Sequence, residues 1–301
     1  MKKVLLIFLA IGFTMVSSPA FSMTILPMDS GTGLAQNLLG EGVTISNVAY
    51  NGSASASGYF EGGMDAGIGI ESGVVLTTGE ASSLNTSENI SPYTSSDNGG
   101  SGDSDLATLI PGYGTFDATV LEFDFVSTGD SAYFNYVFAS EEYNEWVASD
   151  FNDVFGFFID DANYALMPGT DTPVSIDTVN NGANAEYYND NAGLPIFNSY
   201  GEFIRFDELP SLPFAYDGFT DVLTTSITGL TPGETYHIRL AIADAGDQFL
   251  DSGVFLQAGT FSNTETPPEE PGGSDVPEPG TLFLLGIGFA ALAGMTRKLR
   301  K

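Results

Sequence analysis

Residues 121–138 read LEFDFVSTGDSAYFNYVF, and this stretch indicates the fold class. Leu121, Phe123 and Phe125 alternate with polar residues, and a second alternating run begins at Ala132, after the turn Thr128-Gly129-Asp130. Such alternation is typical of half-buried β-strands, whereas a helical pattern would repeat every ~3.6 residues. The stretch therefore predicts two consecutive strands joined by a short turn, within a three-strand meander over residues 116–159.

The same alternation extends along the chain on both sides of this pair. It recurs in residues 155–159, 236–242 and 254–258, and no interior stretch keeps a helical period. We therefore predict an all-β domain over residues 23–263, a two-sheet antiparallel sandwich of jelly-roll type. Residues 82–102 and 180–199 are expected to form long loops, since they are rich in small and polar residues.

The charge of the mature region is strongly one-sided. The chain has 39 acidic residues, all between residues 23 and 280, where Arg205 and Arg239 are the only basic residues. Nucleic acid is excluded as a partner, because phosphate binding needs clustered Lys and Arg. The absence of cysteine excludes disulfides, thiol nucleophiles and thiolate metal sites.

The N-terminus has the three parts of a secretory signal peptide. Lys2 and Lys3 precede a short apolar run, and small residues follow at Ala20 and Ser22. We predict a signal peptide over residues 1–22, cleaved after Ser22, with the Sec translocon and signal peptidase as partners.

The C-terminus predicts a membrane segment behind a linker. Residues 264–280 are rich in Pro, Glu and Gly, and residues 281–296 are almost wholly apolar or small. A basic cytoplasmic tail over residues 297–301 then carries Arg297, Lys298, Arg300 and Lys301. At about 1.5 Å per residue the apolar segment spans roughly 23 Å, less than the ~30 Å hydrocarbon core, which suits a transient anchor.

The motif before the apolar segment is Val276-Pro277-Glu278-Pro279. Together with the apolar segment and the basic tail, it resembles the PEP-CTERM sorting signal of Gram-negative bacteria. The resemblance implies recognition by an exosortase, a membrane protease that removes the tail. The expected route is a transient stay at the inner membrane and then the cell surface or the extracellular matrix.

Acidic clusters at predicted strand ends suggest a metal site, because Ca²⁺ takes six to eight hard oxygen ligands. The preferred ligands are Glu142, Asp153, Asp244, Asp247 and Asp251. Secondary candidates are Asp103, Asp105, Glu141 and Asp150. A solvated acidic surface is the alternative, and no organic cofactor is expected.

Tyr143 and Trp146 are candidates for stacking against sugar rings. The carboxylates beside them also suggest a glycosidase pair, although the sequence does not give the separation on which that mechanism depends. The lone histidine, His237, lies on the polar face of a predicted strand, and no nucleophile elbow accompanies it. We therefore assign no catalytic residues.

Several blocks in order resemble the choice-of-anchor L domain. They include residues 50–53 (YNGS), 138–143 (FASEEY), 151–158 (FNDVFGFF) and 241–244 (AIAD). The resemblance implies an exported protein with a C-terminal anchor and supplies no catalytic residues. We expect a non-enzymatic structural or adhesive component of an exopolysaccharide or biofilm matrix. A glycan-binding module is the alternative, favoured by a groove of exposed aromatic residues beside residues 141–146, and a carbohydrate-active enzyme comes third.

Overall fold

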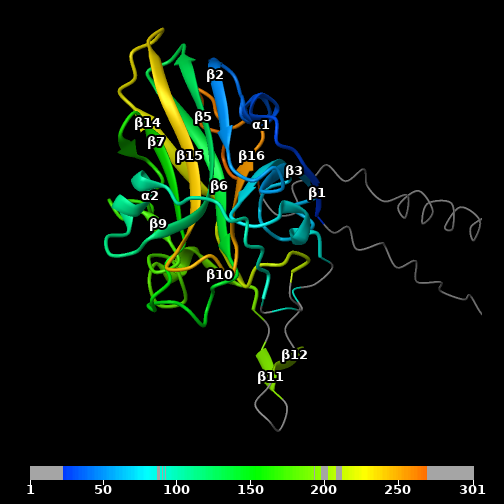
Figure 1. Ribbon diagram of the computed structural model, residues 1–301. Helices are drawn as coiled ribbons and strands as arrows, with labels where there is room; N and C mark the ends of the chain where they lie inside the picture. Colours follow the sequence, from blue (N-terminus) through cyan, green and yellow to red (C-terminus); the bar gives the residue numbers. More distant parts are fainter. Residues whose placement is uncertain are drawn as a thin grey trace, which may run out of the picture.

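The computed structural model describes residues 23–86, 89, 91, 93–192, 194–197, 203–207 and 212–269 (Figure 1). The predicted signal peptide, with its cleavage site, lies outside these residues. The sorting motif Val276-Pro277-Glu278-Pro279, the apolar segment and the four basic residues Arg297, Lys298, Arg300 and Lys301 lie outside them too.

Two antiparallel sheets form the domain. The larger sheet has eight strands in the order β1-β3-β4-β16-β6-β13-β10, with β14 also paired to β6. Its strands are β1 (Thr24–Pro27), β3 (Ser57–Glu61), β4 (Ser72–Thr77), β6 (Ser131–Ser140), β10 (Tyr188–Asp190), β13 (Gly218–Thr220), β14 (Leu223–Thr228) and β16 (Ser252–Gln257).

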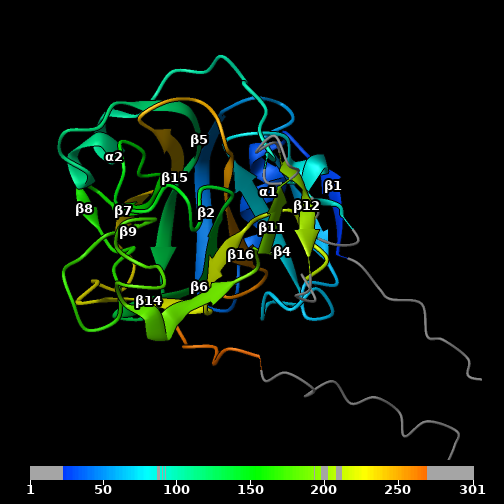
Figure 2. The same cartoon turned by 90° about the horizontal axis from the view of Figure 1, so that it is seen from below.

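The smaller sheet has six strands in the order β2-β5-β15-β7-β8, with β9 also paired to β7. These strands are β2 (Val43–Asn51), β5 (Thr115–Ser127), β7 (Val154–Ile159), β8 (Ala162–Asn163), β9 (Val174–Ser175) and β15 (Thr235–Ala245). The two sheets face each other, with β5 and β15 in one layer and β6 and β16 in the other (Figures 1 and 2). The prediction of a two-sheet antiparallel sandwich is confirmed.

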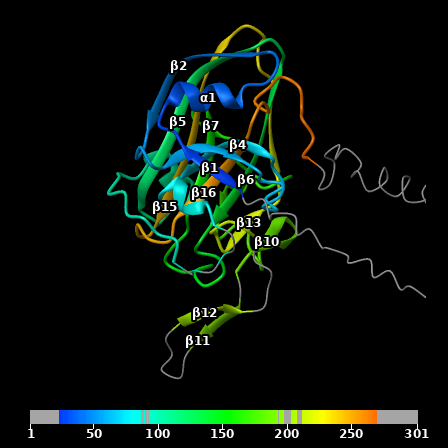
Figure 3. The same cartoon turned by 90° about the vertical axis from the view of Figure 1, so that its right-hand side faces the viewer.

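Short helices and one hairpin complete the described structure. The helices are α1 (Gly31–Leu38), α2 (Ser104–Leu109), η1 (Ala81–Leu84) and η2 (Ala185–Tyr187). The hairpin, β11 (Leu194–Phe197) and β12 (Phe203–Asp207), extends away from the sandwich (Figure 3). It falls partly within the predicted loop of residues 180–199.

The main core lies between the sheets and follows from the period of two. Leu121, Phe123 and Phe125 are fully buried, because alternate side chains of β5 point towards the larger sheet. Phe134 of β6 stacks on Phe157 of β7 across the interface, with ring centroids 5.5 Å apart. Aromatic side chains of both sheets thus interdigitate.

Both outer faces are also partly covered, which the alternation did not predict. Helix α2 covers the smaller sheet around Phe158, and residues 62–71 and 212–216 cover the larger sheet around Phe255. All six residues of β7 and of β16 are therefore buried. For this reason β7 and the middle of β16, Val254 to Leu256, are apolar on both faces.

One end of the sandwich gathers the acidic loops. There β6 ends at Ser140 and β15 ends at Ala245, while β7 begins at Val154 and β16 begins at Ser252. Main-chain hydrogen bonds join the loops, from Glu141 N–H to the Asp251 carbonyl at 3.1 Å and from Asn152 N–H to the Ala245 carbonyl at 2.9 Å. Acidic residues far apart in the chain are thus brought together.

Candidate functional site

The acidic loops bury a cluster of carboxyl groups, called here the buried cluster. Its members are Glu141, Glu142, Asp153, Asp244 and Asp251, each at most 2% exposed. The charges of Asp153, Asp251 and Glu142 each raise the pKa of Asp244, so the four carboxyl groups lie close together. Four of the five preferred metal candidates, and the secondary candidate Glu141, therefore meet at one end of the core.

Most of these carboxyl groups have oxygen atoms without a hydrogen-bond partner. Asp153 is the exception, since it accepts from Ala245 N–H at 2.8 Å and from the Ser252 hydroxyl at 2.6 Å. Neither oxygen of Asp244 has a partner, and one oxygen each of Asp251, Glu141 and Glu142 also lacks one. Buried polar atoms are normally hydrogen-bonded, because burial removes their bonds to water. The cluster is therefore incomplete as it stands.

Burial raises the pKa of every group in the cluster, because the charged form loses its hydration. The pKa of Asp153 rises to about 8, that of Asp251 to about 7 and that of Glu142 to about 11. The pKa values of Asp244 and Glu141 rise well above their ordinary range for the same reason. Neighbouring carboxylates raise all five further.

A loop expected to be a free surface segment closes over the cluster. Within residues 94–100, every second residue donates its main-chain N–H group to a buried carboxylate. The bonds run from Thr94 to Glu141 at 2.8 Å, from Ser96 to Asp251 at 2.9 Å, from Asn98 to Asp117 at 3.0 Å and from Gly100 to Asp117. No apolar periodicity marks this loop, so sequence reasoning missed its role. Its small residues, which let the main chain approach closely, were the available signal.

The carboxyl groups do not form a finished metal cage. Among the described residues, no three Asp, Glu, His or Cys side chains are arranged to hold a metal ion. Asp247 lies beside Glu142 but is not buried with the cluster, since it is half-exposed and accepts from Phe249 N–H at 2.9 Å. Calcium binding stays a prediction at this point.

The secondary candidates Asp103 and Asp105 lie on the outer face of the smaller sheet. Both form ion pairs with Arg239, that of Asp105 measuring 2.6 Å, and Asp103 also caps α2. A guanidinium group thus occupies the place that a metal would take. Asp150 is exposed at the surface.

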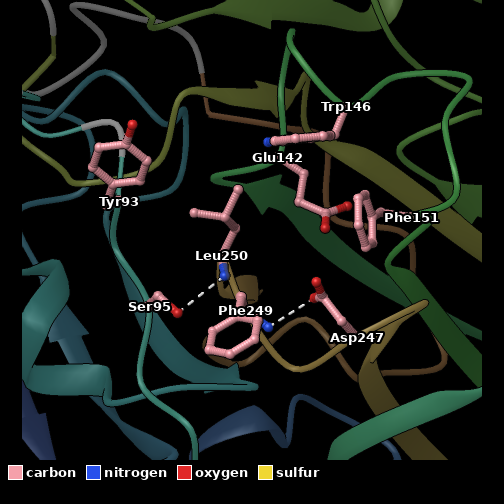
Figure 4. Close-up of a pocket in the computed structure, with 8 residues that line it drawn as sticks. All are labelled: Tyr93, Ser95, Glu142, Trp146, Phe151, Asp247, Phe249 and Leu250. Carbon is pink, nitrogen blue, oxygen red and sulfur yellow. Dashed lines mark hydrogen bonds between the residues drawn. The ribbon is translucent and has the colours of Figure 1, made fainter. Parts of the chain in front are cut away.

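An aromatic pocket of about 320 Å³ opens beside the buried cluster (Figure 4). Its rim carries Tyr93, Trp146 and Phe249, which are 68%, 41% and 54% exposed. They are three of the four large apolar side chains exposed among the described residues. The remaining lining residues are Ser95, Glu142, Phe151, Asp247 and Leu250.

Local contacts hold the pocket in shape. Trp146 packs edge-on against Phe151, with centroids 5.2 Å apart, and Trp146 N–H donates to the Glu142 carbonyl at 3.1 Å. On the other side, Leu250 N–H donates to the Ser95 hydroxyl at 3.1 Å. The rim therefore belongs to three loops, which are residues 141–153, residues 246–251 and residues 93–100. The last of these closes over the buried cluster and is called here the covering loop.

Two carboxyl groups supply the polar part of the pocket. Those of Glu142 and Asp247 point towards each other in Figure 4, and no described Lys, Arg or His lines the pocket. Tyr143 corrects a prediction, because it is fully buried and its hydroxyl donates to the Val179 carbonyl at 2.7 Å. It is closed to a sugar, whereas Trp146 is open to one.

Comparison with known proteins gives two matches. Residues 28–262 match the family model of the choice-of-anchor L domain, and residues 275–298 match the PEP-CTERM protein-sorting motif. Both resemblances seen in the sequence are confirmed. No curated protein and no solved structure matches the chain. None of the helices within the described residues has the length and apolar character needed to span a membrane.

Proposed function

We propose, from the premise that this chain belongs to the choice-of-anchor L domain family, that its sandwich is a non-enzymatic adhesive component of an extracellular polysaccharide matrix. The PEP-CTERM motif supports an exported protein that is processed by an exosortase and sorted to the cell surface. Export through the Sec translocon and signal peptidase is part of the proposal. The aromatic pocket beside residues 141–146 favours the glycan-binding alternative, and it supports an adhesive role that acts through glycan binding.

The pocket has the chemistry that sugar binding needs. Aromatic faces cover the apolar C–H faces of a sugar ring, and carboxylates accept hydrogen bonds from its hydroxyl groups. Its volume of about 320 Å³ lies at the lower end of ligand pockets, enough for one or two rings. Trp146 and Phe249 also expose apolar surface that a domain without a partner would bury. A surface-bound polysaccharide chain fits these features.

The charge of the mature region narrows the class of polysaccharide. Glu142 and Asp247 line the pocket, and Arg239 and His237 pair with acidic residues on the outer face of the smaller sheet. A polymer of uronic acids would bring further negative charge towards a mature region that has 39 acidic and two basic residues. Neutral or amine-bearing sugars are therefore the preferred ligands.

A glycosidase is the second candidate, because the carboxyl groups of Glu142 and Asp247 face each other in the pocket. The raised pKa of Glu142 would suit a general acid. Sugar release separates the two functions: an enzyme liberates reducing ends, and Glu142→Gln abolishes the release. The adhesive protein binds polysaccharide without shortening it.

A binding assay with matched variants tests the adhesive role. The full chain is measured against immobilised neutral, amine-bearing and uronate polysaccharides. Trp146→Ala is expected to weaken binding about tenfold, since loss of a stacked aromatic costs about 1.4 kcal/mol. Leu26→Ala is the control, because Leu26 is 63% exposed but lies on β1, outside the pocket lining. Equal losses in both variants, or no binding to any polymer, would contradict the proposal.

A further inference from the structure

The positions of the buried carboxyl groups follow from the alternation of the strands. In β15, Ile238, Leu240 and Ile242 point into the main core, whereas Ala241 and Ala243 face outward. Asp244 is the next inward position, and a register shift against β5 falls between Ile242 and Asp244. Bulges of this kind often re-aim a side chain. A carboxyl group thus occupies a core position at the end of the sandwich.

The neighbouring strands place polar groups at the same level. Asp153 precedes β7, whose inward residues are Phe155 and Phe157, and Glu142 follows the inward series of β6. The Ser252 hydroxyl donates to Asp153 at 2.6 Å, and the Thr78 hydroxyl accepts from Ser252 N–H at 2.9 Å. A polar layer therefore closes the end of the apolar core, with Asp244 within it.

Several buried carboxylate oxygens of this layer lack a hydrogen-bond partner, and this lack is called here the deficit. Asp244 has two buried oxygens without a partner, and Asp251, Glu141 and Glu142 have one each. Protonation would add donors, yet no carboxyl pair in the cluster shares a hydrogen bond among the described contacts. Arg239 and His237 pair with acidic residues on the outer face of the smaller sheet. Neither of them supplies a hydrogen-bond partner to these oxygens.

From this deficit we infer that the buried cluster binds one Ca²⁺ ion, with Asp244 as its central ligand. Hard carboxylate oxygens suit Ca²⁺, which accepts six to eight ligands in a flexible arrangement. Mg²⁺ needs a strict octahedron and keeps its water, which a closed core does not supply. Among the residues that the structure describes, no three Asp, Glu, His or Cys side chains are arranged around a metal ion, so Asp244 and one further carboxylate would share the ion with neutral oxygens. The hydroxyl groups of Thr78 and Ser252 are within this layer.

The calcium inference does not rest on the proposed sugar pocket. Its central ligand Asp244 does not line that pocket, and neither does Asp251 or Asp153, although Glu142 belongs both to the buried cluster and to the pocket lining. Failure of polysaccharide binding would therefore leave the calcium inference standing. Conversely, a protein that ignores Ca²⁺ could still bind sugar.

The test uses the full chain and Ca²⁺ alone as the probe, with Mg²⁺ for comparison. Calorimetric titration should detect about one Ca²⁺ per chain, and the melting temperature should rise in Ca²⁺ relative to a chelator. Asp244→Asn should lower the affinity at least tenfold. In chelator this variant should melt at or above the wild-type temperature, because a neutral amide replaces a buried carboxyl group whose ionised form is unfavourable there. Asp150→Asn, which removes an exposed charge, is the matched control and should bind Ca²⁺ normally.

A second variant provides an independent test in case Asp244→Asn does not fold. A Cβ atom at Gly79 would lie 1.6 Å from Oδ2 of Asp251, so Gly79→Ala must displace this carboxyl group. We expect it to weaken Ca²⁺ binding several-fold without changing any charge. The inference is overturned if the wild-type chain shows no Ca²⁺-dependent heat or melting shift. Equal affinity for Ca²⁺ in wild type and Asp244→Asn would overturn it as well.

Discussion

Two groups of carboxylates in this domain have opposite surroundings. On the outer face of the smaller sheet, Arg239 contacts Asp103, Asp105 and Glu122, the last at 3.5 Å, and its guanidinium group lies 5.9 Å from the Phe158 ring centroid. At the end of the core, the buried cluster has no such partner among the described residues. Both groups look alike in the sequence, as acids near strand ends. The difference is whether a distant strand brings a cation to them.

This contrast assigns different roles to the two groups. The outer group is compensated within the chain, so it contributes to stability by itself and needs nothing from the solvent. The buried cluster costs free energy until a cation or protons compensate it. The chain has two arginines and one histidine in its mature part, and two of these three serve the outer face. Export into a medium that contains Ca²⁺ would supply what the sequence lacks.

The largest expected effect is the pH dependence of stability in chelator. Burial raises the pKa of Asp153 from 3.8 to about 8, so the folded state holds a proton that the unfolded chain loses above pH 4. The contribution of this group to the free energy of unfolding is therefore fully present below pH 4 and is lost as pH rises towards 8. One such group costs about 1.4 kcal/mol per pH unit, or about 3 kcal/mol between pH 5 and pH 7. Thermal melting should show a fall of roughly 6–12 °C.

The response to Ca²⁺ sharpens this prediction. In saturating Ca²⁺ the carboxylates are ionised in the folded state too, so the fall between pH 5 and pH 7 should shrink by more than half. Asp153→Asn should make the fall in chelator smaller by the contribution of one group, because the other members of the cluster also have raised pKa values. A melting temperature that is constant or rising over this range in chelator would show that the cluster is compensated in another way.

Removal of Arg239 is the next largest effect and acts on the outer group. Arg239→Leu leaves Asp103, which is 9% exposed, beside Glu122 without a cation. Breaking a buried pair costs about 3–5 kcal/mol, and the partial exposure of this group reduces the expected cost to about 2 kcal/mol. Chemical denaturation measures it, and Ca²⁺ should not restore the loss. Full rescue by Ca²⁺ would mean that the two groups are coupled, contrary to the comparison.

The strands and the core-facing position of Asp244 could be predicted from the sequence, but the partner of each acidic residue could not. Period-two alternation predicts the strands of residues 121–125 and 236–242 and thus the sandwich. The same alternation, continued from Ile238 through Ile242, places Asp244 on the core side, although its burial emerges only in the fold. The partner of each acid was not predictable, because Arg239 meets Asp103 and Asp105 across 136 and 134 residues. Contacts of that range depend on strand order, which local patterns do not determine.

The role of the covering loop and the lining of the pocket also could not be predicted from local sequence patterns. Residues 94–100 have the composition of a free loop, yet their main-chain N–H groups bind buried carboxylates. Main-chain bonds leave no trace in side-chain periodicity. Likewise, Tyr143 and Trp146 are three residues apart, and one is buried while the other is exposed. Their neighbours along the chain are too similar to distinguish them.

The smallest expected effect concerns His237 at the edge of the outer group. Its ring lies 2.8 Å from Asp124, and hydrogen bonds from Asn47 and then from His237 hold the pKa of Asp124 below its usual range. This lowered pKa contributes stability above the unfolded pKa of about 4, and the contribution is lost as pH falls through the folded value. His237→Asn should therefore lower the melting temperature by at most about 2 °C at pH 7, since exposed pairs contribute little.

Salt then distinguishes this pair from the buried cluster. Exposed charges are screened at 1 M ionic strength, where the Debye length is about 3 Å, so the effect of His237→Asn should shrink there to the part that its hydrogen bond to Asp124 contributes. Charges at the end of the core are shielded from ions by the protein, and the difference between Ca²⁺ and chelator should persist in 1 M NaCl. If salt removed both effects equally, the buried cluster would be open to solvent ions, and its need for a specific cation would be lost with it.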